Sequence, residues 1–410
     1  MALSSDPGGL PQAADLGTVV ELRTVRWAAQ PNLLWVQVLT SAGAVGLGET
    51  YYLPGAVESV LHDLAADLVI GQPAGAITRT WQTIFSCTNF FGYAGAEMRA
   101  LSALDMALWD ALGQATGVPV CQLLGGAVRD TMPVYNTCVN AGPHSDWDLA
   151  LADPGTLAAD LQQQGYLGMK VWPWDRFAPQ VAGRGSTGPA GWSAMGPMGS
   201  YLSPADLETG LSMLTAARDR VGTGIELLVE GHSRWDINMA IRIARAVEPL
   251  GVLWAEDLCQ PDSPQDLARL ARETRVPQAV SERLISRFPF REVLREQAAH
   301  VVLLDVAWTG GITEARRIAD AAGTYHLPFA PHDCTGPVTA LANVHLAAAM
   351  PNCLAVEVVR GFIDGYYREV LDQPLSVVHG TVAAPSRPGL GAALAPDFTA
   401  RPDVTVRVSA

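Results

Sequence analysis

Three short apolar runs, each closed by an acidic residue, recur along this chain at a constant interval. The acids are Glu230, Glu256 and Glu282, so the intervals are 256 − 230 = 26 and 282 − 256 = 26 residues. A strand, a helix and two short loops need that length, because a parallel crossover takes about a dozen residues or more and usually contains a helix. The interval therefore predicts three neighbouring parallel strands with a carboxylate at the end of each.

Acids at the carboxyl ends of buried parallel strands would point into one cup. Three carboxylates in a cup repel one another unless a cation lies between them. Carboxylate oxygens favour a hard ion, and Mg²⁺ is the usual choice where a substrate oxygen completes an octahedron. Zinc is disfavoured because the series contains no histidine or cysteine. We therefore expect one Mg²⁺ per subunit, bound by Glu230, Glu256 and Glu282.

The regular alternation of strand-like and helical segments extends well beyond these three acids. Eight strands with intervening helices favour a (β/α)8-type barrel over an open doubly wound sheet, which usually shows fewer strands and a Gly-rich phosphate turn. No GxGxxG follows a strand in this sequence. The strand-like runs cover residues 134–139, 169–172, 225–230, 252–256, 278–282, 301–305, 328–332 and 354–357, and helical segments between them include 239–247, 264–273, 312–322 and 338–349.

The barrel pattern occupies only the middle of the chain. Before it, two β-rich runs flank a turn at residues 41–43, which is a hairpin signal, and leucines recur at helical spacing over 100–114. We predict an α+β capping domain built from the N-terminal part and the C-terminal tail. The expected boundaries are 1–130 for the cap, with a mobile tail at 1–16, then 131–360 for the barrel and 361–410 for a segment that returns to the cap.

Composition excludes several classes of protein. The formal net charge of −14 (27 basic and 41 acidic residues) argues against nucleic-acid binding. An anionic substrate remains compatible, because a bound metal can reverse the local field. The longest apolar stretches fall short of a membrane span. Six scattered cysteines without CxxC spacing, and an N-terminus without the features of a signal peptide, predict a cytoplasmic protein.

Two further strand-like runs end in Asp305 and His332, an interval of 332 − 305 = 27 residues. A carboxylate bonded to one ring nitrogen of a histidine fixes the tautomer and raises the basicity of the other nitrogen. Such a pair is more often structural, but its place in the same strand-end series as three acids favours a general base. A metal beside a base suits removal of a proton α to a carboxylate, because the intermediate needs a cation on its oxygens.

Four more side chains at predicted strand ends have two interpretations each. His232 would face the same side as Glu230 in an extended segment, or it is an exposed loop histidine. Lys170 would bind a substrate carboxylate or pair with an acid. Trp172 would line the pocket or pack in the core. Glu357 would form a hydrogen bond at a developing oxyanion or a salt bridge.

Together these residues resemble the enolase superfamily, in its mandelate racemase and sugar-acid dehydratase branch. The resemblance covers nearly the whole chain and includes motifs at 102–110, 123–126, 310–311, 330–333 and 388–391. It implies that Glu230, Glu256 and Glu282 are metal ligands. It also implies that His332 and Asp305 form the base dyad, and that Glu357 contacts the substrate carboxylate or enolate.

The second and third strands separate the reactions of that family. Racemases and muconate-type cycloisomerases usually carry Lys-x-Lys on the second strand, whereas this chain has Trp172 at the second position. Glu230-x-His232 resembles the Asp-x-His of galactonate- and mannonate-type dehydratases, whose histidine protonates the departing 3-hydroxyl. Glutamate at position 230 departs from the commoner aspartate.

We therefore expect a Mg²⁺-dependent acid-sugar dehydratase. His332 would abstract the C2 proton of an aldonate and His232 would protonate the leaving 3-hydroxyl, giving a 2-keto-3-deoxy acid, while Lys170 and Glu357 steady the enediolate. Residues 49–52 and a long Gly/Pro-rich connection at 173–202 would close over the sugar tail, unless the connection is only a tolerated insertion. Substrate contacts are expected from Trp172, Tyr51, Tyr52, Arg283 and Asp333.

Two alternatives remain open. A cycloisomerase, racemase or epimerase of a sugar-derived or anhydro-sugar carboxylate would need the same base and cation. A non-catalytic sugar-acid binder is the more remote alternative, because the dyad is intact. The partner in each case is a small-molecule carboxylate, with no nucleic acid or membrane. The family resemblance also implies a homo-oligomer, either a dimer or an octamer.

Overall fold

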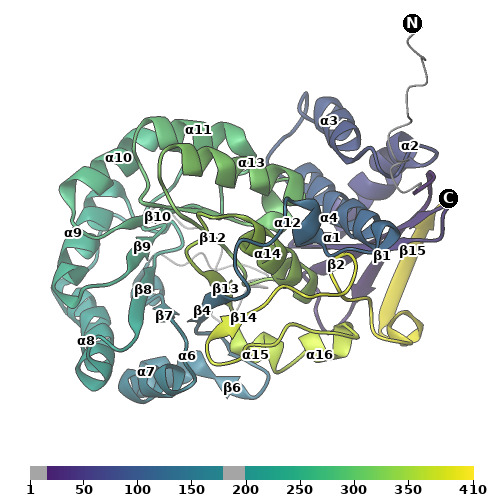
Figure 1. Ribbon diagram of the computed structural model, residues 1–410. Helices are drawn as coiled ribbons and strands as arrows, with labels where there is room; N and C mark the ends of the chain where they lie inside the picture. The colour runs from purple at the N-terminus through teal and green to yellow at the C-terminus, as the bar shows by residue number, and fades with distance from the viewer. Residues whose placement is uncertain (1–15, 179–198) are drawn as a thin grey trace, which may run out of the picture.

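The computed structural model describes residues 16–178 and 199–410 of the chain (Figure 1). The expected tail at 1–16 therefore lies almost wholly outside the described residues. So does most of the 173–202 connection. Within the described ranges, no helix is long and apolar enough to cross a membrane.

A four-stranded antiparallel sheet forms one side of the cap. Its order is β15 (Val404–Ser409), β1 (Val19–Trp27), β2 (Leu33–Thr40) and β3 (Val45–Tyr51). The expected hairpin is β2–β3, with Leu39 opposite Val45. The last strand of the chain pairs along β1, with Leu22 opposite Ser409, so the purple and yellow strands lie side by side in Figure 1. The C-terminal segment is thus part of the cap sheet.

Helix α4 (Ala96–Thr116) packs directly on strand β3, and two glycines allow this contact. A Cβ atom at Gly46 would lie 1.9 Å from the carbonyl oxygen of Ala107, and one at Gly48 would lie 1.9 Å from that of Ala103. Because no side chain fits there, glycine lets the helix and strand backbones approach closely. The apolar stripe seen at 100–114 is buried at this contact and against the barrel.

Eight parallel strands form the barrel, in the order β12–β11–β10–β9–β8–β7–β4–β13. The amide of Phe329 donates to the carbonyl of Asn352, and the amide of Leu354 donates to that of Phe329, so the segment before β13 also joins β12. The strands are β4 (Met132–Thr137), β7 (Gly168–Val171), β8 (Glu226–Glu230), β9 (Trp254–Glu256), β10 (Gln278–Val280), β11 (Val301–Leu304), β12 (Phe329–Pro331) and β13 (Val356–Val358).

Helices surround the barrel, and the four helical segments named from the sequence are all present. The prediction of a modified (β/α)8 barrel with an α+β cap is confirmed. After β13 the chain forms the short helices α15 (Arg360–Ile363) and α16 (Tyr367–Val370). A short strand, β14 (Thr381–Val382), then pairs antiparallel with β4 before the chain returns to the cap. The main outer helices are α7 (Pro154–Gln163), α8 (Pro204–Val221), α9 (Ile237–Val247), α10 (Pro264–Glu273), α11 (Arg287–Arg295), α13 (Gly311–Thr324) and α14 (Pro337–Ala349).

Helix α14 differs from the others because every one of its residues is buried. A helix that is apolar on all sides is surrounded by protein on all sides, and α14 contacts strands β12 and β13 of the barrel as well as β3 of the cap. The helix therefore ties the cap to the barrel close to the carboxyl ends of the strands.

Candidate active site

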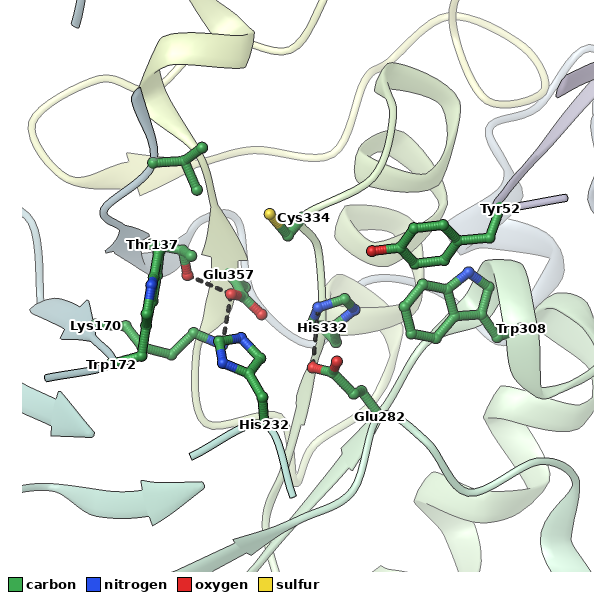
Figure 2. A pocket seen from close by; sticks show the side chains of 11 residues that line it. Tyr52, Thr137, Lys170, Trp172, His232, Glu282, Trp308, His332, Cys334 and Glu357 are labelled. Atoms are coloured by element: carbon green, nitrogen blue, oxygen red, sulfur yellow. Dashed lines mark hydrogen bonds and ion pairs between the residues drawn. The ribbon is translucent and has the colours of Figure 1, made fainter. Parts of the chain in front are cut away.

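A pocket opens at the carboxyl ends of the barrel strands, under the end of cap strand β3 (Figure 2). Figure 2 shows Lys170, Trp172 and Thr137 on one side and Tyr52 and Trp308 on the other. The pocket brings together polar groups from six barrel strands or the loops that follow them. Its lining residues are Tyr52, Thr137, Val139, Lys170, Trp172, His232, Glu282, Trp308, His332, Cys334 and Glu357.

The three glutamates of the 26-residue series meet at this end of the barrel. Glu230 and Glu256 are the last residues of β8 and β9, and Glu282 lies two residues beyond β10. One carboxylate oxygen from each lies within 4.8 Å of the other two, and all three side chains are buried. Burial and the negative charge of Glu256 raise the pKa of Glu230 well above its usual value. Three oxygen donors crowded in this way fit a hard divalent cation.

Lys170 lies at the centre of the buried carboxylates. Its Nζ atom is 2.7 Å from Oε1 of Glu256, 2.7 Å from Oε1 of Glu357 and 3.4 Å from Oε2 of Glu230. Burial alone would lower the lysine pKa, but the charges of Glu256 and Glu357 raise it well above the usual value. Of the two interpretations of Lys170, pairing with acids is therefore the one present in this structure.

Glu357 on β13 accepts hydrogen bonds from several directions. Tyr135 donates its hydroxyl to Oε2 at 3.2 Å, the amide of Asp333 donates to the same oxygen at 3.1 Å, and Thr137 donates its hydroxyl to Oε1. Burial opposes ionisation, yet Lys170 and His332 lower the pKa of Glu357 to about 2. The side chain is thus an ionised carboxylate held in a fixed position at the pocket wall.

His332 and Asp305 form the predicted pair. Asp305 follows β11 and caps α12 (Val306–Thr309) through its Oδ1 atom, while its Oδ2 atom lies 2.7 Å from Nδ1 of His332. The other ring nitrogen, Nε2, lies 3.0 Å from Glu282. Burial alone would lower the pKa of His332, but the carboxylates of Glu282, Glu357 and Asp305 raise it to about 10.

His232 reaches the pocket by a different route from the one predicted. Strand β8 ends at Glu230, and His232 has a left-handed backbone (φ 45°), so the extended i, i+2 argument is wrong. The amides of Gly231 and His232 donate to Oε1 of Glu230 at 3.1 and 2.7 Å. These bonds tie the turn to the first carboxylate of the series, and the imidazole still lines the pocket.

Of the five expected substrate contacts, the structure places two in the pocket lining, Trp172 and Tyr52. Tyr51 packs edge-on against Tyr52 at 4.5 Å between ring centroids, and its hydroxyl accepts from Asn32. Arg283 donates to Gln260 at 2.9 Å. The Oδ1 atom of Asp333 accepts from the amide and hydroxyl of Thr335, while its own amide holds Glu357. Tyr51 and Asp333 thus contact lining residues, Tyr52 and Glu357, from outside the lining.

Glu49 does not close over the pocket as expected for residues 49–52. Its carboxylate is fully buried and accepts hydrogen bonds from the indole of Trp35 at 2.7 Å and from the amide and hydroxyl of Thr339 at 3.0 and 2.7 Å. A carboxylate is favourable at a helix N-terminus, where amide groups lack partners. Glu49 therefore joins β3 to the first turn of α14, and only Tyr52 from this segment reaches the pocket.

Four lining residues were not predicted: Thr137, Val139, Trp308 and Cys334. Thr137 ends β4, so the strand-end rule that selected the acids applies to it too. Cys334 follows His332 by two residues, and burial raises its thiol pKa well above the usual value. Trp308 lies in α12 with Arg99 over its ring at 4.5 Å, and a contact with a residue of the cap has no local sequence signal.

Two family models match the sequence. Residues 19–125 match the mandelate racemase / muconate lactonizing enzyme N-terminal domain, and residues 155–398 match the enolase C-terminal domain-like family. The first matched range includes strands β1, β2 and β3 of the cap sheet and helix α4. The second matched range includes the three glutamates of the 26-residue series and the Asp305–His332 pair.

Similar proteins support the same relationship. A D-galactonate dehydratase of Variovorax paradoxus is 30% identical over 91% of each chain, and a D-galactonate dehydratase family member of Streptomyces bingchenggensis is 31% identical over 91% of this chain and 90% of its own. The crystal structure of an enolase of the mandelate racemase subgroup from Agrobacterium tumefaciens is 37% identical, with a TM-score of 0.84 and coverage of 96% and 98%. An enolase from Sargasso Sea environmental sequencing is 39% identical, with a TM-score of 0.85.

Proposed function

The chain belongs to the mandelate racemase/muconate lactonizing enzyme family of the enolase superfamily, and on this premise we propose that it is a Mg²⁺-dependent sugar-acid dehydratase. The substrate is an aldonate-type carboxylate that loses its C2 proton and its 3-hydroxyl. The product is a 2-keto-3-deoxy acid. The relatives named D-galactonate dehydratase support this choice of substrate class.

The ligands of the cation are Glu230, Glu256 and Glu282. The fit rests on their donor chemistry, since three buried carboxylates with oxygens within 4.8 Å of one another offer only hard oxygen ligands. A divalent cation bound there would offset the charge of Glu282 beside His332 and stabilise negative charge on the substrate carboxylate. Lys170 adds a fixed positive charge to the same cluster.

His332 is the general base. Asp305 occupies Nδ1, so Nε2 is the nitrogen that is available to accept the C2 proton. Nε2 lies 3.0 Å from Glu282, so the base is next to the carboxylate series where the substrate carboxylate would bind. The ionised Glu357 and the ammonium of Lys170 lie in the same pocket and orient the carboxylate end of the substrate.

His232 is the general acid. One observation carries the assignment: two imidazoles line a single pocket, with His332 on the side of Trp308 and His232 on the side of Lys170 and Trp172 (Figure 2). Elimination needs a base that removes the C2 proton and an acid that protonates the oxygen on C3. Two separate histidines can perform these two tasks. A non-catalytic protein that only binds sugar acids would not need two histidines in this arrangement.

Isomerisation is the nearest competing reaction and uses the same base. A Lys-x-Lys racemase would need a basic group at position 172, where this chain has a tryptophan whose ring stacks on Trp147 at 4.4 Å.

Mass spectrometry of products from a panel of mono- and diacid sugars, beginning with D-galactonate, tests the proposed dehydration. Dehydration lowers the product mass by one water and gives a 2-keto acid, whereas a product of unchanged mass from every substrate would refute it.

A further inference from the structure

The loop that follows β7 contributes a second carboxylate–histidine pair to the pocket. Asp175 begins a short 3₁₀ helix, η2 (Asp175–Phe177), at the start of the long connection. Its Oδ2 atom lies 2.5 Å from Nδ1 of His232 and 3.2 Å from Nε of Arg234. The side chains of Asp175 and His232 are only 9% and 11% exposed, so the contact is largely shielded from water.

An aromatic contact also restricts the His232 imidazole. The ring of Trp172 meets it edge-on, with centroids 5.5 Å apart and planes at 70°. Trp172 is itself held by Trp147, which stacks on it at 4.4 Å and 9°. The imidazole of His232 therefore has a polar partner, Asp175, at Nδ1 and an aromatic neighbour, Trp172, beside the ring. Both residues lie in the segment that follows β7, and Trp147, which stacks on Trp172, lies after β4.

The backbone at His232 is strained in a way that favours this placement. His232 and Ser233 both adopt left-handed conformations, with φ of 45° and 57°. Residues other than glycine seldom adopt this conformation, and such strain persists where surrounding bonds enforce it, often at functional sites. Here the amide of Gly231 donates to the carbonyl of Glu256 at 2.9 Å, and that of Ser233 to the carbonyl of Asp257 at 2.5 Å.

The pair has the same design as the base dyad. In each case a carboxylate from a neighbouring strand end occupies Nδ1, at 2.7 Å for Asp305 and 2.5 Å for Asp175. The nitrogen that remains for the substrate is then Nε2 in both histidines. The described contacts of Asp175 include both His232 and Arg234.

We propose that Asp175 is the positioning residue of His232, and that it directs Nε2 of His232 at the 3-hydroxyl of the sugar acid. The inference rests on the proposed dehydration. In that reaction the C2 proton first passes to His332, and the electron pair of the broken C–H bond moves into the carboxylate, which becomes an enediolate. The enediolate then re-forms the carboxylate, and this electron pair makes the C2=C3 bond. The C3–O bond breaks, and the departing oxygen takes the proton from Nε2 of His232 and leaves as water. The enol then gains a proton at C3 and loses its hydroxyl proton to give the 2-keto acid.

Asp175, in the described first part of the 173–202 connection, would then position the general acid. Asp175 acts through His232 and touches no reacting atom, so its loss should change elimination more than proton abstraction. This difference separates positioning of the acid from general support of the pocket. Removal of a group that merely stabilises the pocket would weaken both steps together.

The test compares Asp175→Ala and Asp175→Asn with the wild-type enzyme. The substrate is the aldonate that wild-type turns over, with D-galactonate tried first. Deuterium incorporation at C2 and formation of 2-keto acid are followed by NMR in deuterated water. Asp206→Asn, on helix α8 after the same connection, is the matched control and should behave as wild-type, because its described contacts are with Ser203.

Elimination by Asp175→Ala should fall by about 10²-fold or more, the lower end of a general acid's contribution, while C2 exchange is retained. Asp175→Asn keeps the size of the side chain and should show the same unequal loss if the alanine variant does not fold. Equal losses of exchange and elimination in either folded variant would overturn the inference. Wild-type elimination rates in both would overturn it too.

A substrate analogue gives a second readout. In the 3-deoxy-3-fluoro aldonate the leaving group is fluoride, which departs without a proton because hydrogen fluoride is a much stronger acid than water. Fluoride release should therefore be restored in Asp175→Ala, and an unrestored rate would contradict the positioning role. A wild-type enzyme that dehydrates no sugar acid would refute the proposed function instead, so the two failures are distinguishable.

Discussion

The Nζ atom of Lys170 lies 2.7 Å from Oε1 of Glu357, although the two residues come from β7 and β13, on either side of β4. Both side chains are buried, at 3% and 0% exposure. The pair crosses the pocket wall and places a fixed positive and a fixed negative charge beside the carboxylate series. Loss of the Lys170 ammonium would leave Glu256 and Glu357 without their described cationic partner.

Lys170→Met should therefore destabilise the metal-free protein. Removal of one member of a buried ion pair costs about 3–5 kcal/mol, because the partner charge remains buried. Urea unfolding in the presence of a chelator measures the change. Arg407→Met is the matched control, because the Arg407–Asp63 pair is largely exposed and such pairs contribute little. Equal unfolding midpoints for the two variants would contradict the account.

Mg²⁺ should raise the unfolding temperature of the wild-type protein and should fail to do so in Glu230→Gln and Glu256→Gln. A ligand present at 100 times its Kd stabilises a protein by about 2.7 kcal/mol, which a thermal melt resolves. Glu273→Gln, on the exposed side of α10, should keep the full shift. A shift that survives in Glu256→Gln would place the ion elsewhere. Activity should likewise disappear with a chelator and return with Mg²⁺.

Asp305→Asn should slow abstraction of the C2 proton by about 10²–10⁴-fold, the usual range of general base catalysis. The amide can still cap α12, but its NH₂ group cannot accept from Nδ1–H of His332, so the wrong tautomer is favoured. Deuterium exchange at C2 measures this step. His326→Asn is the control, because His326 is exposed and asparagine tolerates its left-handed backbone. Exchange at the wild-type rate in Asp305→Asn would exclude the dyad.

Asp105 on α4 should make the stability of the protein depend on pH. Burial raises its pKa from 3.8 to about 7, and its Oδ1 atom has no hydrogen-bond partner among the described residues, so a proton fits there. Between these values the folded protein binds a proton that the unfolded chain has lost, so the free energy of unfolding falls as the pH rises from about 4 to 7.

Asp105→Asn should reduce that slope, because asparagine does not titrate. Urea unfolding at several pH values across the window measures it. Asp219→Asn, on the exposed face of α8, should keep the wild-type slope. Identical slopes for wild-type and Asp105→Asn would show that Asp105 is ionised in the folded protein throughout this range.

Much of the site could be predicted from the sequence because the strand–helix unit of the barrel repeats at a nearly constant interval. The interval from Glu230 to Glu256 to Glu282 places equivalent positions of neighbouring strands at one end of the barrel, and the same rule reaches Asp305 and His332. The fold prediction follows from the same period. Fine geometry had no such signal, since the turn at His232 depends on tertiary hydrogen bonds to the next strand end.

Contacts between distant segments could not be predicted for a physical reason. Glu49 looked like part of a closing loop, but its surroundings are set by Trp35 and the N-terminus of α14, almost 300 residues away in the chain. Asp175 lies at the start of a Gly/Pro-rich connection, where no periodicity relates it to His232. Such pairings follow from how the elements pack, which the spacing of residues along one strand does not encode.

In the proposed reaction His332 removes the C2 proton and His232 protonates the departing 3-hydroxyl. In deuterated water, His232→Ala should exchange the C2 proton of the aldonate for deuterium and form no 2-keto-3-deoxy acid, whereas His332→Asn should do neither. NMR and mass spectrometry of the recovered sugar acid report both events in one sample. Formation of 2-keto acid by His232→Ala at the wild-type rate, or loss of its C2 exchange, would contradict this proposal.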